Sequence, residues 1–339
     1  MSDVARMAKV GKITVSRVLN DSPHVTDATR KRVFAAIKKL GYVPDESART
    51  LRLQKSRCIG LILPSLLDHF FAICAHAVHE CAQKHGYMVM TVCSNGDPET
   101  EAAQIQAMLR RRIDGIVIVP ASSRKCILAA PEFCDAPAVA FDRPVPGGKQ
   151  DYVVVENQRG AKLAVEHLIK HGHRRIAYLG PSGDFSTIRE RLHGFRIAAK
   201  ERGAETTETS CIDDLPQTIA ALRTMLDGPA APTAAFMPNN VTTKLVVEAL
   251  QTLGVDVPSS LALVGFDSFE LDHVVQPPLT VIAQPFEEMA RQAAELLFER
   301  LENESTVIPQ RKMKLPVALI VRESCGCTQQ AKQTVAVGR

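Results

Sequence analysis

Residues 3–20 read DVARMAKVGKITVSRVLN, and this stretch decides the fold of the N-terminal region. Its apolar residues fall on single helical faces on either side of Gly11, which interrupts the pattern. The sequence therefore predicts a first short helix and a second one from Lys12 to Asn20, joined by a very tight turn. The first face consists of Val4, Ala5 and Ala8, and the second of Val15, Val18 and Leu19.

A third helix is predicted from Ala28 to Leu40, after a turn at residues 20–23. Thr26 is a good N-cap, because its hydroxyl can accept a hydrogen bond from a backbone N–H of the first turn. Gly41 suits the left-handed position that ends many helices, and Pro44 follows it. Three helices with a tight turn between the first two describe a helix-turn-helix module. The inward positions of the third would be Val33, Ile37 and Leu40.

The second helix is the one expected to enter the major groove of DNA, where exposed side chains reach base edges. Arg17 could donate two parallel hydrogen bonds to a guanine, and a surface ion pair is its alternative role. Lys12 could reach a base or a phosphate, and Ile13 could contact a thymine methyl group. Thr14 and Ser16 are expected to bond phosphates.

The charge distribution also favours a polyanionic partner for this region. Residues 1–60 hold 13 basic and five acidic residues, a net charge of +8. The whole chain carries only +4, so the remaining residues carry −4. A solvated, helix-rich surface is the alternative explanation, since Lys and Arg are good helix formers. Taken together with the helix pattern, the charge favours DNA.

Residues 46–57 are predicted to link this head to a different body. The segment is compatible with a helix but is only about two to three turns long, and such helices are marginal alone in water. Leu51, with Arg49 nearby, has no obvious core to join, so insertion into the minor groove is one interpretation. A flexible basic linker is the other. Both interpretations hold if the segment is disordered in the free protein and becomes helical only on DNA.

From Cys58 onward the chain alternates apolar runs with amphipathic segments, a pattern typical of parallel, doubly wound α/β sheets. Two successive sets predict two lobes facing a cleft, with ligand contacts at the carboxyl ends of the strands. The expected strands are 58–64, 87–93, 115–120, 138–141, 175–180, 233–237 and 261–266. The expected helices are 70–85, 98–112, 124–131, 158–171, 187–202, 216–226 and 240–253.

Polar side chains collect around those strand ends, as a ligand site requires. A carboxylate, an arginine and an amide are the usual set for holding adjacent sugar hydroxyls, with an aromatic face beneath the sugar. Loop capping or an ion pair between the lobes is the alternative for Arg191 and Asp267. The expected effector contacts are Phe70, Phe71, Asp142, Arg191, Asn239 and Asp267.

Several other functions find little support in the sequence. No apolar run of about 18 residues predicts a membrane helix, and the first residues lack the apolar core of a secretory signal. The nine cysteines are an odd number and lie mostly within apolar runs, which suits buried thiols in a reducing cytoplasm. No phosphate-binding glycine loop or nucleophile elbow is present, so neither an enzyme nor a cofactor is expected.

Two weak metal signals are also present. His167 and His171 have the spacing of a helical zinc pair, but Leu168 stands where a metalloprotease needs Glu. We interpret the histidines as cations near the C-terminus of a helix that ends at Gly172. The second signal, Cys325-Gly326-Cys327, is weak and lies near the end of the chain. No metal site is therefore expected.

The blocks at residues 3–20, 25–52 and 59–64 resemble the lactose-repressor (LacI/GalR) family of bacterial transcription regulators, and the resemblance extends to about Glu323. It implies a core like that of periplasmic binding proteins. In that core the helix at 285–302 returns to the first lobe and the strand around 316–321 joins the second. It also implies that Arg191, Asn239 and Asp267 contact the effector. The chain departs from the family pattern with Gly11 for Ser, Asp45 for Asn, Asp68-His69 for Asn-Pro, and Asn240 for Asp.

We therefore expect a DNA-binding head (1–45), a hinge (46–57), an effector-binding and dimerisation core (58–327) and a tail (328–339). Within the core, lobe one would comprise about 58–157 and 286–314, and lobe two about 158–285 and 315–327. The expected function is a cytoplasmic repressor of carbohydrate-utilisation genes, which a small sugar or sugar acid releases from its operator.

Three alternatives remain open: a purine-type regulator that binds DNA together with its ligand, a sugar-binding transport protein, and an α/β enzyme. The basic head disfavours the second, and the lack of catalytic motifs disfavours the third. Because one reading helix sees only a few base pairs, a homodimer on palindromic double-stranded DNA is expected. The tail lacks the heptads that would make a tetramer.

Overall fold

The computed structural model describes residues 1–19, 22–42, 55–133, 137–183, 185–210, 212–303 and 309–327. The chain divides into two compact units, Met1–Ser56 and Arg57–Arg339. The expected DNA contacts Arg49 and Leu51 lie outside the described residues. Within the described ranges, no helix is both long and apolar enough to cross a membrane.

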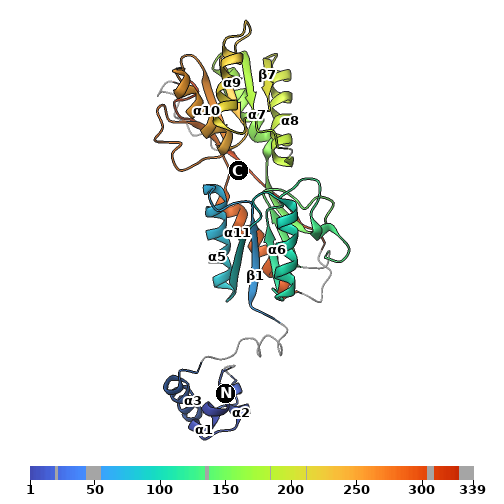
Figure 1. Ribbon diagram of the computed structural model, residues 1–339, viewed down its shortest axis with the longest axis vertical. Helices are drawn as coiled ribbons and strands as arrows, with labels where there is room; N and C mark the ends of the chain where they lie inside the picture. The colour runs from blue at the N-terminus through green and yellow to red at the C-terminus, as the bar shows by residue number, and fades with distance from the viewer. Residues whose placement is uncertain are drawn as a thin grey trace. The chain divides into compact units, whose positions relative to one another are not determined.

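The N-terminal unit contains the three predicted helices, α1 (Ser2–Ala8), α2 (Lys12–Leu19) and α3 (Asp27–Leu40) (Figure 1). Thr26 caps α3, because its hydroxyl accepts a hydrogen bond from the Thr29 N–H at 3.4 Å, and Gly41 ends the helix with φ 57°. The inward placement of Leu40 was wrong: its side chain is 40% exposed, and Ala36 takes the inward position one turn earlier. The buried core of the unit is Val4, Ala5, Ala8, Val15, Val18, Val33 and Ala36.

The first lobe of the second unit is a parallel sheet in the order β11-β5-β4-β3-β1-β2. Alternate residues of β1 face opposite sides: Ile59 and Leu61 pack with α5 and α11, whereas Ile62 packs with α6. Helix α11 therefore covers this sheet although it follows the second lobe in sequence, as the family resemblance implied. The elements are β1 (Cys58–Leu63), α5 (His69–Lys84), β2 (Met88–Cys93), α6 (Pro98–Arg110), β3 (Gly115–Ile118), β4 (Ala138–Phe141), β5 (Asp151–Val155), α11 (Phe286–Glu302) and β11 (Lys312–Leu315).

The second lobe repeats this plan in the order β12-β10-β9-β8-β6-β7. Its strands are parallel except β12, which pairs antiparallel with β10 at the sheet edge and confirms the predicted return of the chain. One face packs with α7 and α8, and the other with α9 and α10. The elements are α7 (Asn157–Lys170), β6 (Arg175–Leu179), α8 (Ser186–Glu201), β7 (Glu205–Thr209), α9 (Leu215–Leu226), β8 (Ala234–Met237), α10 (Asn240–Leu253), β9 (Ala262–Phe266), β10 (Thr280–Ala283) and β12 (Ala318–Ile320).

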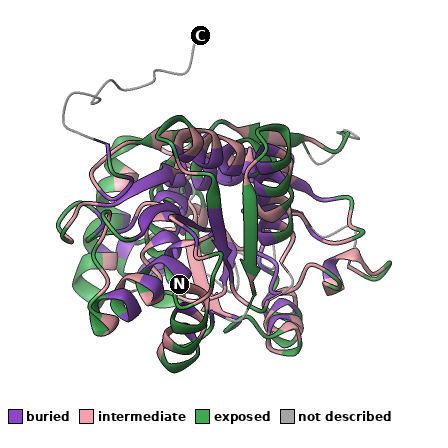
Figure 2. Cartoon of the chain, turned by 90° about the horizontal axis from the view of Figure 1, so that it is seen from above, coloured by how far each residue is buried: buried purple, intermediate pink, exposed green. Residues whose placement is uncertain are grey.

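Buried residues lie in the inner strands and on the inner faces of the helices, while the outer helix faces are exposed (Figure 2). The edge strand β7 is exposed along most of its length. This confirms the α/β class with two doubly wound lobes. The prediction of a helix at 124–131 was wrong, because only a short 3₁₀ turn, η1 (Ile127–Ala129), forms there. The strands β5, β7, β10 and β11 were not predicted from the sequence. Of these, β5 and β10 each follow the preceding strand through a loop without a helix, which does not fit the expected strand–helix alternation.

Candidate DNA-binding and effector-binding sites

Helix α2 presents the polar face that the sequence predicted. Lys12 and Arg17 are exposed, and Ile13 is 71% exposed although it is apolar. The opposite face is held in the core by Val15 and Val18, which are 0% and 1% exposed. An apolar side chain held out in water next to two basic ones has the chemistry that a base edge and its phosphates require. Thr14 and Ser16 are half-buried on the flanks of this face.

The centre of the expected effector site is an ion pair. Arg191 Nη1 lies 3.5 Å from Asp267 Oδ2, and both side chains are more than nine-tenths buried. Arg191 also donates to Asn157 Oδ1 at 2.8 Å and to the Pro238 carbonyl at 2.6 Å. Its guanidinium lies over the Phe266 ring, 3.7 Å from the centroid. The arginine is thus fixed in orientation by groups on three different elements.

Arg191 itself does not lie at a strand end, where the sequence analysis placed the whole set. It is in the second turn of α8, and its side chain reaches across to the ends of β8 and β9. Asp267 does follow a strand directly. Burial raises the pKa of Asp267, and the charge of Arg191 and a hydrogen bond from Gln284 oppose that rise. Desolvation outweighs these two partners, so the pKa of Asp267 lies above its usual value.

Asp142 occupies the matching position in the first lobe. Its N–H donates to the Val153 carbonyl at 3.0 Å, just as the Asp267 N–H donates to the Ile282 carbonyl at 2.8 Å. Both aspartates have left-handed backbones, with φ 65° for Asp142 and 77° for Asp267. Left-handed non-glycine residues are uncommon, and strained backbones cluster at functional sites. The two lobes therefore each present one buried aspartate on the same kind of strained turn.

The two lobes are in contact around these aspartates. Asn240 Nδ2 of lobe two donates to Asp68 Oδ1 of lobe one at 2.8 Å, and the Ser186 N–H donates to Ser123 Oγ at 2.7 Å. Arg143, bonded to Asp142 at 2.9 Å, lies over the ring of Phe185 with 4.5 Å between guanidinium and centroid. Residues from both lobes thus converge on one polar region.

The carboxylates of both lobes also affect the pKa of Cys74. Burial raises the pKa of this thiol well above its usual value, and the charges of Asp142, Asp68 and Asp267 raise it further. Since these carboxylates come from both lobes, their fields overlap at the N-terminal half of α5. A polar ligand with several hydroxyl groups would meet acceptors from both sides here.

Three expected site residues have structural roles in this structure. Phe70 and Phe71 lie on α5 and are 6% and 8% exposed; Phe70 packs edge-on against Phe286, with ring centroids 4.8 Å apart. Asn239 caps α10, since its side chain accepts a hydrogen bond from the Thr242 N–H at 2.8 Å.

Sequence reasoning missed two polar residues at the centre of the site. Asn157 follows β5 and binds Arg191, and Gln284 follows β10 and binds Asp267. Both satisfy the strand-end rule that found Asp142 and Asp267. They were missed because their strands were not predicted.

Comparisons with known proteins support this architecture. Residues 1–45 match the model of bacterial regulatory proteins of the lacI family, and residues 165–325 match a periplasmic binding protein-like domain. The ribose operon repressor of Escherichia coli strain K12 is 30% identical over 96% of this chain and 99% of its own length. The repressor PurR of Aliivibrio salmonicida is 30% identical over 89% of this chain and 92% of its own length.

The structural comparison agrees. The crystal structure of the lac repressor dimer bound to operator and the anti-inducer ONPF matches with a TM-score of 0.83 at 26% identity, covering 95% of this chain and 98% of the other. A complex of the transcriptional regulator CelR with cellobiose matches with a TM-score of 0.69 at 29% identity, over 95% and 98%. The chain therefore belongs to the lacI family of bacterial regulatory proteins, and it is a DNA-binding transcriptional regulator rather than an enzyme.

Proposed function

We propose that this chain is a cytoplasmic repressor of carbohydrate-utilisation genes, which a small sugar or sugar acid releases from its operator. In this proposal residues 1–45 bind DNA and residues 46–57 form a hinge. The effector binds between lobe one (58–157 and 286–314) and lobe two (158–285 and 315–327). Lys12, Ile13, Thr14, Ser16, Arg17, Arg49 and Leu51 contact DNA, and Phe70, Phe71, Asp142, Arg191, Asn239 and Asp267 contact the effector.

The buried pair of Arg191 and Asp267 carries the proposal. A carboxylate next to a fixed guanidinium offers adjacent acceptors and donors, which is the pattern that vicinal hydroxyls require. Asp142 and Asp68 face this pair from lobe one and supply further acceptors. A ligand bonded to both lobes would hold them at one angle, and a hinge movement of this kind can be passed to the DNA-binding heads.

A purine co-repressor is the second candidate, because a relative at 30% identity is a PurR repressor. The groups at the centre of the site are charged: Arg191, Asp267 and Asp142 offer donors and acceptors that suit the hydroxyl groups of a sugar better than a flat base.

Ligand-dependent release of the operator tests this function. An operator would be selected from random duplexes on the full-length protein, and its binding followed by fluorescence anisotropy while pentoses, hexoses, sugar acids and purines are added in turn. We expect one sugar or sugar acid to release the DNA, and binding must be reciprocal, so the operator must weaken that ligand's affinity. Tighter DNA binding with a purine would favour the second candidate, and failure to select any duplex would overturn the proposal.

We propose further that two copies associate through a groove formed by both lobes. Leu67 of lobe one and Phe269, Leu271 and Val275 of lobe two line it, together with Lys244 of α10. Leu67 is 98% exposed and Leu271 is 58% exposed, so the groove presents large apolar side chains to water. A second copy that covers them would remove this apolar surface from solvent. Because the groove includes both lobes, a change in lobe angle would alter the pairing.

Light scattering on the full-length protein is expected to show a dimer at micromolar concentration. Leu271→Arg should shift the protein toward monomer, because it replaces an apolar contact with a charge that must lose its water when the copies associate. Met88→Arg is the matched control: Met88 is 76% exposed at the start of β2, outside the groove, so its replacement should leave the dimer intact. A stable wild-type tetramer, or dimers unaffected by Leu271→Arg, would contradict this prediction.

A further inference from the structure

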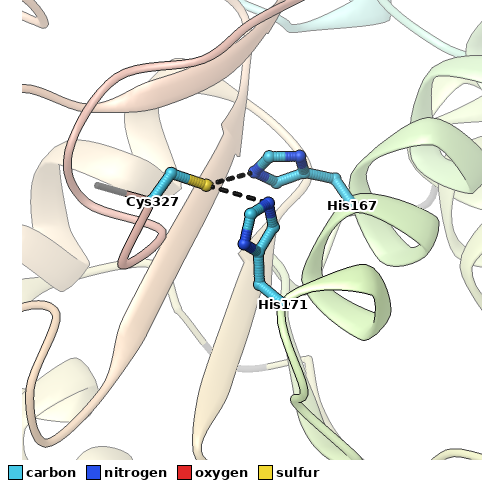
Figure 3. Close-up of side chains that lie close together, drawn as sticks. All are labelled: His167, His171 and Cys327. Carbon is cyan, nitrogen blue, oxygen red and sulfur yellow. Dashed lines mark hydrogen bonds between the residues drawn. The ribbon is translucent and has the colours of Figure 1, made fainter. Parts of the chain in front are cut away.

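Two motifs that lie far apart in the sequence meet at the end of α7. Cys327 Sγ lies 3.1 Å from His171 Nε2 and 3.3 Å from His167 Nε2, and the cysteine is 160 residues beyond His167. Both histidine rings point from the last turn of α7 toward the sulfur on the C-terminal loop (Figure 3). We refer to His167, His171 and Cys327 as the His–Cys cluster.

The loop that carries Cys327 is held in place by the second sheet. Ser324 Oγ donates to a carbonyl of β9 at 2.8 Å and accepts from an N–H of β10 at 2.8 Å. Gly326 has φ 79°, a left-handed conformation that favours glycine. The turn brings the Cys325 thiol to 3.0 Å from Cys327 Sγ, as a donor to it. The hydrogen bonds of Ser324 and the turn at Gly326 therefore fix the position of the Cys327 sulfur.

Cys327 Sγ and the two ring nitrogens are three potential metal-ligand atoms, and all three lie within 4.8 Å of one another. Imidazole nitrogen and thiolate sulfur are ligands that Zn²⁺ prefers. With bonds of about 2.3 Å to sulfur and about 2.0 Å to nitrogen, the sulfur and each nitrogen of a tetrahedral site lie about 3.5 Å apart. The observed separations are slightly shorter, so a small outward shift would admit the ion.

We propose that the His–Cys cluster binds one Zn²⁺ ion, with the fourth position open to solvent beside the exposed His171. Cys325 stays outside the ligand set and donates its S–H to the bound thiolate, which positions that ligand. Leu168 stands where a metalloprotease needs a catalytic Glu, so it disfavours that enzyme class only. A zinc site without catalysis needs no Glu at this position. The ion would tie the last turn of α7 to the C-terminal loop. The matched periplasmic binding protein-like domain ends at residue 325, so Cys327 lies outside it.

A second group of donor atoms in the described chain has a different explanation. Cys81, His85 and Glu295 also lie close together. However, His85 Nε2 is paired with Glu295 Oε2 at 3.2 Å, and its ring stacks on Phe298 with centroids 4.1 Å apart. The ring is thus held by a contact with a carboxylate and by a stacking contact, and neither needs a metal ion. This group supplies an internal control for the zinc experiment.

Metal analysis of the full-length protein, prepared without a polyhistidine tag, tests the proposal. After chelation and reconstitution with zinc sulfate, we expect one zinc per chain by mass spectrometry of the metal. Replacement by Co²⁺ should give the visible absorption of tetrahedral cobalt and a thiolate charge-transfer band. Zinc should raise the thermal unfolding midpoint, since it binds only the folded protein.

Substitutions locate the ion. Cys327→Ser and His171→Ala should each remove the bound zinc and the zinc-dependent rise in the unfolding midpoint. Cys325→Ser should keep the ion with about 10- to 100-fold lower affinity. Cys126→Ser, a half-buried thiol of lobe one, and His85→Ala should change nothing. Because His171 is exposed, its variant tests the site even if Cys327→Ser fails to fold. Wild-type protein without zinc, zinc retained in His171→Ala, or zinc lost in His85→Ala would overturn the proposal.

Discussion

Replacing Asp267 with alanine is expected to abolish the response to the effector while operator binding remains intact. Asp267 is a buried carboxylate beside Arg191, and the DNA-binding residues belong to a separate compact unit. Truncating one partner of a buried charged pair typically costs about 2–5 kcal/mol in binding, a factor of about 30 or more. The sugar identified in the release assay should then fail to release the operator at the concentrations that release it from the wild-type protein. Anisotropy titrations of the operator complex with that sugar measure this loss.

Two controls make this result specific. Asp267→Asn keeps the shape and removes only the charge, so it separates charge from packing. Asp227→Ala removes an exposed carboxylate at the end of α9, in the same lobe, and should leave the release curve unchanged. If Asp267→Ala releases DNA at the wild-type sugar concentration, Asp267 does not contact the effector.

Arg17→Ala is expected to weaken operator binding and to relax the preference for one base pair in each half-site. The side chain is exposed on α2, whose other face is fixed in the core of the head. An arginine paired with guanine contributes about 1–3 kcal/mol of discrimination, and a dimer would lose that amount in both half-sites. Binding to the selected operator and to single-base variants, measured at one salt concentration, gives the size of the loss.

The salt dependence separates base contacts from phosphate contacts. Each phosphate contact adds about 0.9 to the slope of log affinity against log salt. Lys39→Ala is the matched control, an exposed basic residue at the C-terminal end of α3. It should reduce binding to operator and to random DNA by the same factor, if at all. An equal loss on every sequence for Arg17→Ala would mean that Arg17 touches only the backbone.

Local signals in the sequence were sufficient to predict the three helices of the head. The apolar spacing of Val15 and Val18, the cap at Thr26 and the left-handed end at Gly41 each act within one or two turns, and the structure confirms them. Leu40 was misplaced because helical periodicity identifies a face of the helix but not how far along the helix the core extends. The core includes Ala36, which is 4% exposed, and not Leu40.

The effector site was only partly predictable, because its residues meet through tertiary contacts. Strand-end positions identified Asp142 and Asp267, since a strand's end can be read from a local run of apolar residues. Asn157 and Gln284 depend on two strands that the alternation pattern did not show. The contact of Asn240 with Asp68 joins residues 172 positions apart. No local sequence pattern predicts a contact between residues that are so far apart in the chain.

The sequence by itself determined the helix-turn-helix head, the alternating α/β body and the membership of a regulator family, because periodicity and caps are short-range properties of the chain. Tertiary structure decided which side chains meet. It oriented Arg191 by contacts from separate elements, it packed Phe70 and Phe71 into a core, and it brought Cys327 to His167 and His171. These outcomes depend on how the two sheets place residues that are far apart in the sequence, from 34 positions for Arg191 and Asn157 to 160 for His167 and Cys327. Burial against those sheets, not local propensity, selects them.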